Sequence, residues 1–235
     1  MRILVLGSGA REHAIITALL REEPRHHVVA APGNAGIAAD VPVVALDATD
    51  PSVVTNYAIE NNIELVVIGP EAPLVAGVAD ALRTRGIPVF GPGKAAAALE
   101  GSKTFAKRVM DKAGVPTGRA VRAGTLAEAK AALDELGVPY VVKADGLAAG
   151  KGVLVTSDRP AAVAHATHWL QHGNVLIEEF LDGAEVSLFL LSDGHSVLPL
   201  SPAQDYKRLG DHDAGDHGER DRQAARVRVG TDLEV

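Results

Sequence analysis

Short apolar runs alternate with segments of helical periodicity through the first hundred residues of the chain. Four runs predict buried strands, namely RILVL (2–6), VVAA (28–31), ELVVIG (64–69) and IPVFG (87–91). AREHAIITALLRE and VAGVADALRTRG place apolar residues at the spacing of a helix. This alternation predicts an α/β fold with a doubly wound parallel sheet, which binds ligands at the carboxyl ends of its strands. We therefore expect the turns GSGAREH, APGNAG and GPEAPL to face one crevice.

The pattern changes near Gly101. SKTFAKRVMDKAG predicts a helix with Ser102 as its N-cap and Gly114 as its terminator. Beyond it, YVVKA and GVLVTS predict two strands around a glycine-rich loop, and TLAEAKAALDELG and PAAVAHATHWLQHG predict helices. NVLIEEFLDG, AEVSLFLLSDG and SVLPL continue as β-rich segments. These elements indicate a small α+β lobe.

We divide the chain by this change of pattern. The first domain is expected over residues 1–101 and the second over 102–210, with its small lobe at about 117–190. Residues 211–235 form a divergent tail with no motif of their own.

Composition narrows the function classes. The 235 residues are 47% hydrophobic and carry a net charge of −7, which argues against non-specific nucleic-acid binding and against an anionic membrane surface. No cysteine is present, so disulfides and thiolate metal sites are excluded. MRILVLGSGA is too short in its apolar run for a signal peptide, and no stretch approaches the ~20 apolar residues of a membrane span. We expect a cytoplasmic protein; the sequence leaves its oligomeric state open.

The loop KADGLAAGKGV (143–153) combines three glycines with two lysines. It is not a P-loop, because only three residues separate Gly146 from Gly150 and because Gly152, not Ser or Thr, follows Lys151. Glycine-freed amides still suit a phosphate, and Lys143 on a strand of valines requires a partner charge. The alternative is an ordinary glycine-rich hairpin.

GSGAREH matches only the first half of the dinucleotide fingerprint. Glu12 stands at the third glycine position, and the second strand lacks the acidic residue that a ribose requires, which argues against an NAD-dependent oxidoreductase. Gly9 at a helix N-terminus, with Arg11 beside it, favours a phosphate or carboxylate ligand. The alternative is a tight strand–helix turn with a solvated arginine.

Other polar positions allow two interpretations each. Glu71 is either a ligand for an amine or a sugar hydroxyl, or a helix cap; Asn34 either binds ligand or supports its turn. Glu178 and Glu179 are adjacent on a strand and should point to opposite faces, so that one of them is solvated. Three histidines, His165, His168 and His172, share a helical face, but solvated histidines are the simpler interpretation and we assign no metal ligand.

Taken together, GSGAREHA, APGNAG, GPEAPL, LEGSK, KADGLAAGKGV, IEEFLDG and SPAQDYKR occur in a characteristic order and spacing. From Met1 to about Gly215 the chain resembles the phosphoribosylamine–glycine ligase (glycinamide ribonucleotide synthetase) family of purine biosynthesis, in the ATP-grasp superfamily. The resemblance implies that ATP activates glycine as an acyl phosphate, which the amine of 5-phosphoribosylamine attacks. The products would be glycinamide ribonucleotide, ADP and phosphate. A sister ATP-grasp ligase, such as a carboxylase, is disfavoured by the pairing of LAAGKGV with GPEAPL.

The resemblance also implies roles for single residues. Lys103 and Lys143 match the catalytic lysines that contact the ATP phosphates. The expected nucleotide contacts add a flap and an adenine–ribose site, formed by Gly150, Lys151, Gly152, Glu178, Leu181 and Glu185. The expected contacts to glycine and 5-phosphoribosylamine are Gly9, Arg11, Asn34, Glu71, Asp205, Lys207 and Arg208.

Two departures from the family pattern qualify this assignment. Only LQHG separates Trp169 from Asn174, where the family has a longer glycine-rich loop. After GDHDAG the chain reads DHGERDRQAARVRVGTDLEV in place of P-N-T-G-G-M-G. Mg²⁺ (or Mn²⁺) is expected with ATP, but the family's metal-binding Glu and Asn find no match. We expect a frameshifted or truncated chain, and the alternative function is a catalytically incomplete fragment that binds ATP or a ribosyl phosphate.

Overall fold

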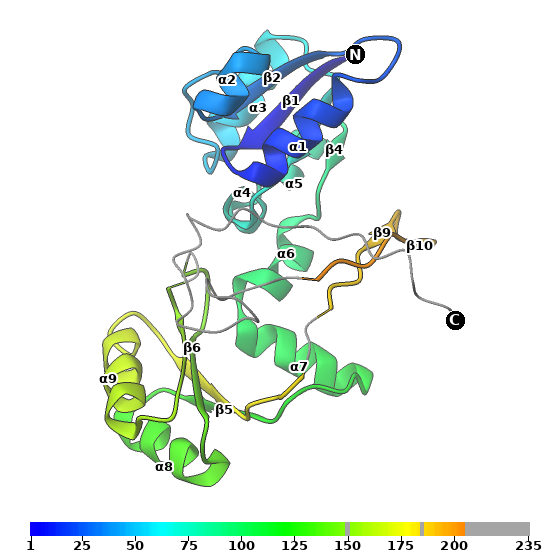
Figure 1. Cartoon of the computed structure of the whole chain (residues 1–235). Helices are drawn as coiled ribbons and strands as arrows, with labels where there is room; N and C mark the ends of the chain where they lie inside the picture. Colours follow the sequence, from blue (N-terminus) through cyan, green and yellow to red (C-terminus); the bar gives the residue numbers. More distant parts are fainter. Residues whose placement is uncertain (149–150, 184–185, 205–235) are drawn as a thin grey trace. The chain divides into compact units, whose positions relative to one another are not determined.

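Figure 1 shows the chain as a computed structural model that describes residues 1–148, 151–183 and 186–204. It divides into two compact units. Unit 1 comprises Met1–Thr117 together with Asp145–Leu147, and unit 2 comprises Gly118–Ala144 with the described residues from Ala148 onward. Each unit is described by itself.

Unit 1 is built on a parallel sheet of four strands in the order β2-β1-β3-β4. The strands are β1 (Arg2–Gly7), β2 (His27–Pro32), β3 (Leu65–Ile68) and β4 (Val89–Phe90). All four match predicted apolar runs, so the doubly wound parallel α/β fold is confirmed.

The side chains of β1 alternate between two cores. Leu4 and Leu6 join one buried cluster, whereas Ile3 and Val5 join another with Ile16. A strand covered on both faces is apolar at every position, which explains why RILVL reads as a continuous apolar run.

Seven helices accompany this sheet in the described part of unit 1. They are α1 (Ala10–Leu19), α2 (Ala35–Asp40), α3 (Pro51–Glu60), α4 (Glu71–Ala76), α5 (Val78–Thr84), α6 (Lys94–Gly101) and α7 (Lys103–Ala113). The prediction of one helix over VAGVADALRTRG is wrong in one respect, because Gly77 has a φ of 98° and separates α4 from α5. A left-handed residue ends an α-helix.

The predicted caps of α7 are confirmed. The Ser102 hydroxyl accepts a hydrogen bond from the Phe105 amide at 3.1 Å. Gly114 takes the left-handed conformation with a φ of 68°, which glycine adopts without steric cost.

Unit 2 contains an antiparallel sheet in the order β5-β8-β6-β7. The strands are β5 (Ala120–Ala123), β6 (Tyr140–Ala144), β7 (Val153–Thr156) and β8 (Val175–Glu178), and the helices are α8 (Leu126–Leu136) and α9 (Arg159–Trp169). Leu133 and Ala166 from the helices pack with Val142 and Ile177 in one buried cluster. This is the predicted α+β lobe.

A two-stranded antiparallel hairpin, β9 (Leu190–Ser192) and β10 (Val197–Pro199), follows in the chain. Its apolar side chains are exposed, with Leu190 at 58% and Leu198 at 59%. In the described part of AEVSLFLLSDG, which predicts a longer strand, the observed strand β9 has three residues. None of the helices in the described ranges has the length and apolar character needed to span a lipid bilayer.

Candidate functional site

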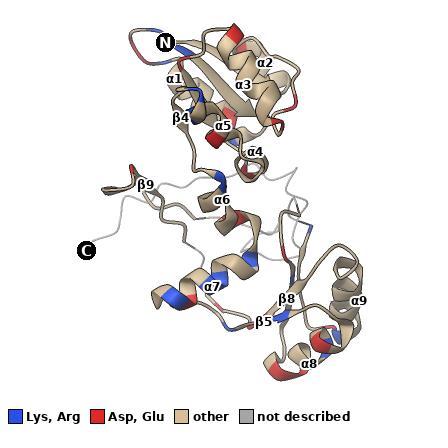
Figure 2. Ribbon diagram, turned by 180° about the vertical axis from the view of Figure 1, so that it is seen from behind, with Lys and Arg blue, Asp and Glu red and all other residues tan. Residues whose placement is uncertain are grey.

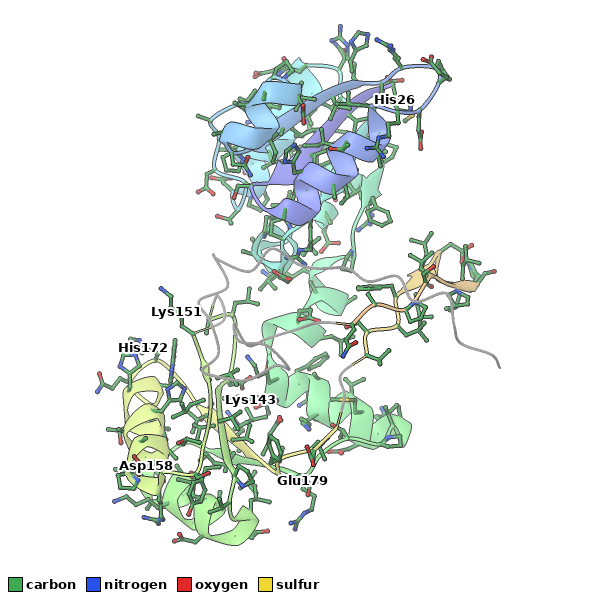
Figure 3. The ribbon with its side chains drawn as sticks, viewed as in Figure 1. His26, Lys143, Lys151, Asp158, His172 and Glu179 are labelled. Carbon is green, nitrogen blue, oxygen red and sulfur yellow. The ribbon has the colours of Figure 1, made fainter. Side chains whose placement is uncertain are left out.

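Lys143 lies near the end of β6, in the middle of the sheet of unit 2 (Figure 3). In the strand register it faces Leu176 of β8 and Val153 of β7. Its ammonium lies 2.5 Å from a carboxylate oxygen of Glu178, and the side chains of the two residues are 29% and 10% exposed. The partner charge that the sequence requires for Lys143 is therefore supplied by the protein itself.

The glycine-rich loop begins directly after Lys143 and Ala144. Its base is closed by a hydrogen bond of 2.7 Å from the Ala144 amide to the Gly152 carbonyl. A Cβ atom on the buried Gly152 would lie 2.6 Å from the Ala148 Cβ and 2.9 Å from the Ala144 Cβ. Only glycine fits at this position without a shift of the backbone. Lys151 is exposed (Figure 3), and Gly150 lies outside the described residues.

The residues after β6 bind the start of α7 within unit 1. Lys103 donates from its Nζ to the Gly146 carbonyl at 2.8 Å. Asp145 accepts hydrogen bonds from the Ser102 hydroxyl at 3.1 Å and from the Thr104 amide at 3.2 Å. The structure thus joins the motifs LEGSK and KADG, although the hydroxyl of Ser102 and the carboxylate of Asp145 are 43 residues apart in sequence.

The carboxylate of Asp145 stays ionised in this environment. Burial acts to raise its pKa, but hydrogen bonds from Thr104 and Ser102 outweigh that effect and hold the pKa below its ordinary value. Sequence reasoning missed Asp145. Its signal was an acidic residue directly after a buried strand and next to Gly146. Figure 2 marks the positions of Lys and Arg along the ribbon of α7, the helix whose Thr104 amide donates to Asp145.

The two adjacent glutamates at the end of β8 have different partners, as their alternation on a strand predicts, but Glu179 is not fully solvated, because its side chain is only 32% exposed. Glu178 turns to Lys143, whereas Glu179 lies 3.1 Å from the Nε of Arg119. Leu181 is 67% exposed, and Glu185 lies outside the described residues. Of the predicted adenine and ribose contacts, the structure places Glu178 in the sheet and leaves Leu181 on the surface.

The three predicted turns of unit 1 meet at the carboxyl ends of its strands. Arg11 of α1 forms an ion pair of 3.2 Å with Glu71, the first residue of α4. Asn34 donates from its Nδ2 to the Ser8 carbonyl at 2.7 Å and accepts from the Ile37 amide at 2.9 Å. Asn34 therefore caps α2 and also ties GSGAREH to APGNAG.

Of the remaining predicted substrate contacts, only Gly9 lies within the described residues. The Gly9 amide donates to the Glu12 carboxylate at 2.6 Å. Asp205, Lys207 and Arg208 lie outside the described residues.

Two histidines of α9, His165 and His168, and His172 after its end lie around the ring of Trp169. The ring of His168 lies 5.2 Å from that of Trp169 and 5.4 Å from that of His172, between ring centroids. Across residues 1–148, 151–183 and 186–204, no three or more His, Cys, Asp or Glu side chains are grouped so as to hold a metal ion.

Comparison with known proteins extends these observations. Residues 1–100 match the N domain of phosphoribosylglycinamide synthetase, and residues 101–218 match its ATP-grasp (A) domain. The phosphoribosylamine–glycine ligase of Leifsonia xyli subsp. xyli (strain CTCB07) is 78% identical over 216 residues, which are 92% of this chain and 52% of that protein. The same enzyme of Streptomyces coelicolor is 57% identical over 215 residues, 92% of this chain and 51% of that protein.

A solved structure agrees with the sequence relatives. The crystal structure of phosphoribosylamine–glycine ligase from Thermotoga maritima superposes with a TM-score of 0.74 at 35% identity, over 92% of this chain and 53% of that one. The antiparallel lobe with its glycine hairpin thus belongs to the ATP-grasp class. The chain belongs to the phosphoribosylglycinamide synthetase family, as its motifs indicate. It spans about half the length of the relatives it matches.

Proposed function

We propose that the chain takes part in the ATP-dependent ligation of glycine to 5-phosphoribosylamine, which yields glycinamide ribonucleotide, ADP and phosphate. The observation that carries this proposal is the combination of Lys143, paired with the buried Glu178, and a hairpin whose base accepts only glycine at Gly152. Family membership over residues 1–218 supports the choice of substrates. The proposed reaction joins soluble metabolites, which fits a cytoplasmic location.

The proposed chemistry explains why cations and a glycine-rich loop are needed. A carboxylate becomes a good electrophile only after one of its oxygens is phosphorylated, and phosphoryl transfer between two anions requires positive charge around the phosphates. Lys103 and Lys143 would supply that charge, and backbone amides near Lys151 and Gly152 would bind phosphate oxygens. The amine of 5-phosphoribosylamine then attacks the acyl phosphate and expels phosphate.

Mg²⁺ would neutralise phosphate charge when bound with ATP. The described residues offer no cluster that fits such an ion, so we assign no step to it here.

In this proposal, 5-phosphoribosylamine and glycine bind at the carboxyl ends of the strands of unit 1. Gly9, Arg11, Asn34 and Glu71 border this edge, and the Arg11–Glu71 pair presents both a cation and a carboxylate there. By family resemblance we add Asp205, Lys207 and Arg208 to this set. Family resemblance is also the reason for proposing Leu181, Glu185 and Gly150 as nucleotide contacts.

The test is ATP binding, measured by titration calorimetry. Lys143→Met should weaken ATP binding by about tenfold to a hundredfold, because a charge-assisted phosphate contact is worth roughly 1.5–3 kcal/mol. Lys130→Met is the matched control, since Lys130 is an exposed lysine on α8 of the same unit. Equal ATP affinity of the folded Lys143→Met variant and of this control would refute the nucleotide site.

A second candidate function is binding of ATP or a ribosyl phosphate without turnover, and the match of residues 101–218 to the ATP-grasp (A) domain supports its nucleotide-binding part. ADP release that depends on both glycine and 5-phosphoribosylamine separates the two candidates. Turnover by the 235-residue polypeptide establishes the ligase, and ATP binding without ADP release establishes the binding fragment.

A further inference from the structure

Glu12 lies in the first turn of α1, and its side chain folds back over the start of the helix. One carboxylate oxygen, Oε2, accepts a hydrogen bond from the Gly9 amide at 2.6 Å, and the whole residue is only 3% exposed. A carboxylate at this place also compensates the positive end of the helix dipole. The N-terminus of α1 therefore already holds an anion, and that anion belongs to the chain.

Three glycines surround this carboxylate. A Cβ atom on Gly7, at the end of β1, would lie 2.6 Å from two carbons of the Glu12 side chain, and one on Gly9 would lie 2.8 Å from Oε2. A Cβ on Gly69, which follows β3, would clash with Oε1. The ends of two neighbouring strands are thus shaped to enclose Glu12, which is more than a capping interaction requires.

The second oxygen adds an independent observation. Oε1 is buried and has no hydrogen-bond partner within the described ranges of the chain. A buried polar atom without a partner destabilises the folded state, so a group of this kind requires an explanation. The unsatisfied Oε1 of Glu12 has an explanation if the negative charge and the volume of this side chain serve a purpose in the α1 turn.

The position of Glu12 in the sequence identifies what it replaces. Gly7 and Gly9 are the first two glycines of Gly-x-Gly-x-x-Gly, and Glu12 stands at the third. In a dinucleotide-binding turn, the pyrophosphate lies on the amides at the start of this helix. Here the Gly9 amide is bound by the Glu12 carboxylate instead.

We propose that Glu12 is an internal anion that occupies the phosphate position of the α1 turn and determines what this turn can bind. The turn excludes phosphates and dinucleotides, and it accepts only an uncharged or hydrogen-bond-donating part of a ligand. The predicted carboxylate ligand of this turn is thus Glu12 itself. If the function proposed above holds, the phosphate of 5-phosphoribosylamine binds away from the start of α1.

The experiment removes the internal anion and adds an external one. Glu12→Gly completes the Gly-x-Gly-x-x-Gly pattern, and Glu12→Ala empties the same space with a smaller effect on the backbone. The probe is inorganic pyrophosphate, followed through the NMR amide signals of Gly9 and Ala10, since these report on the α1 turn alone. Glu12→Gln is the matched control, because it keeps the volume and should still block the turn.

We expect no saturable shift of these two signals in the wild-type protein or in Glu12→Gln. Glu12→Gly and Glu12→Ala should bind pyrophosphate at least about tenfold more tightly, because the helix N-terminus is then free. Saturable binding at Gly9 in the wild type overturns the proposal, as does a folded Glu12→Gly or Glu12→Ala variant that gains none. If both variants fail to fold, the wild-type titration decides alone. The outcome is independent of ATP binding at Lys143, so the two proposals can fail separately.

Discussion

Replacing Lys143 should destabilise unit 2 as well as weaken ATP binding. Glu178 is only 8% exposed, and the ammonium of Lys143 lies 2.5 Å from its carboxylate. Lys143→Met keeps most of the apolar stem but leaves a desolvated carboxylate without this cation. Leaving a buried polar group unsatisfied costs roughly 1–3 kcal/mol, and a fully buried broken ion pair about 3–5 kcal/mol. Because Lys143 is 29% exposed, we expect the lower range, about 1–3 kcal/mol.

A second variant separates the lost pair from a general packing defect. Lys143→Met with Glu178→Gln removes both charges together and leaves two neutral side chains of similar shape. Such a replacement is often nearly neutral, whereas the single change is not. The double variant should therefore recover most of the stability lost in Lys143→Met. The coupling free energy from this double-mutant cycle should be about 0.5–3 kcal/mol.

The assay is urea unfolding followed by tryptophan fluorescence. Trp169 is the only tryptophan of the chain and packs against the core of unit 2, so its emission reports on that unit. With a slope of about 1–3 kcal/mol per molar urea, the midpoint of Lys143→Met should fall by roughly 1 M. The exposed Lys130→Met control should change the unfolding free energy by less than about 0.5 kcal/mol. A Lys143→Met midpoint equal to that of the control would refute the reasoning.

Two further predictions concern α9 and the glycine hairpin. Burial lowers the pKa of His165, against a raising effect of the Gly152 carbonyl and with a smaller lowering effect of His168. The unfolded chain then binds more protons between the folded-state pKa and about 6.5, so stability should fall as pH falls through this window. Urea midpoints by circular dichroism should show this slope in the wild type and a flatter one in His165→Phe; equal slopes would contradict it. Gly152→Ala should lose about 1–3 kcal/mol in the same assay, because its Cβ meets two others at under 3 Å. Gly118→Ala, whose Cβ has only ordinary contacts at 3.4–3.5 Å, is the control, and equal losses would show that the hairpin base adjusts.

The parallel sheet of unit 1 was predictable because its signal is local. The strands are short apolar runs, and the residues from Ile3 to Leu6 each belong to one of two buried clusters. The caps of α7 were predictable for the same reason, since Ser102 and Gly114 act within a few residues of themselves. The break at Gly77 was missed because helical periodicity continues across it, and only its left-handed backbone ends α4.

Interactions between residues distant in sequence are harder to predict from the sequence. The sequence required a charge for Lys143 but did not identify Glu178, because β6 and β8 pair across an intervening strand and helix. The role of Asp145 is not visible in the sequence, because it depends on hydrogen bonds to the start of α7. Glu12 departs from a glycine pattern in the sequence, but its enclosure depends also on Gly69, which follows a different strand.

The internal partners of the proposed site residues decide how ligand affinity should be interpreted. Lys143 binds Glu178, Lys103 binds the Gly146 carbonyl, and Arg11 binds Glu71. A ligand that contacts one of these cations must displace its partner or share the cation with it. The measured affinity is then the difference between two interactions, because the displaced carboxylate or carbonyl loses its hydrogen bond. Removing such a lysine therefore changes both the free and the bound protein, and ligand binding must be measured beside stability for each variant.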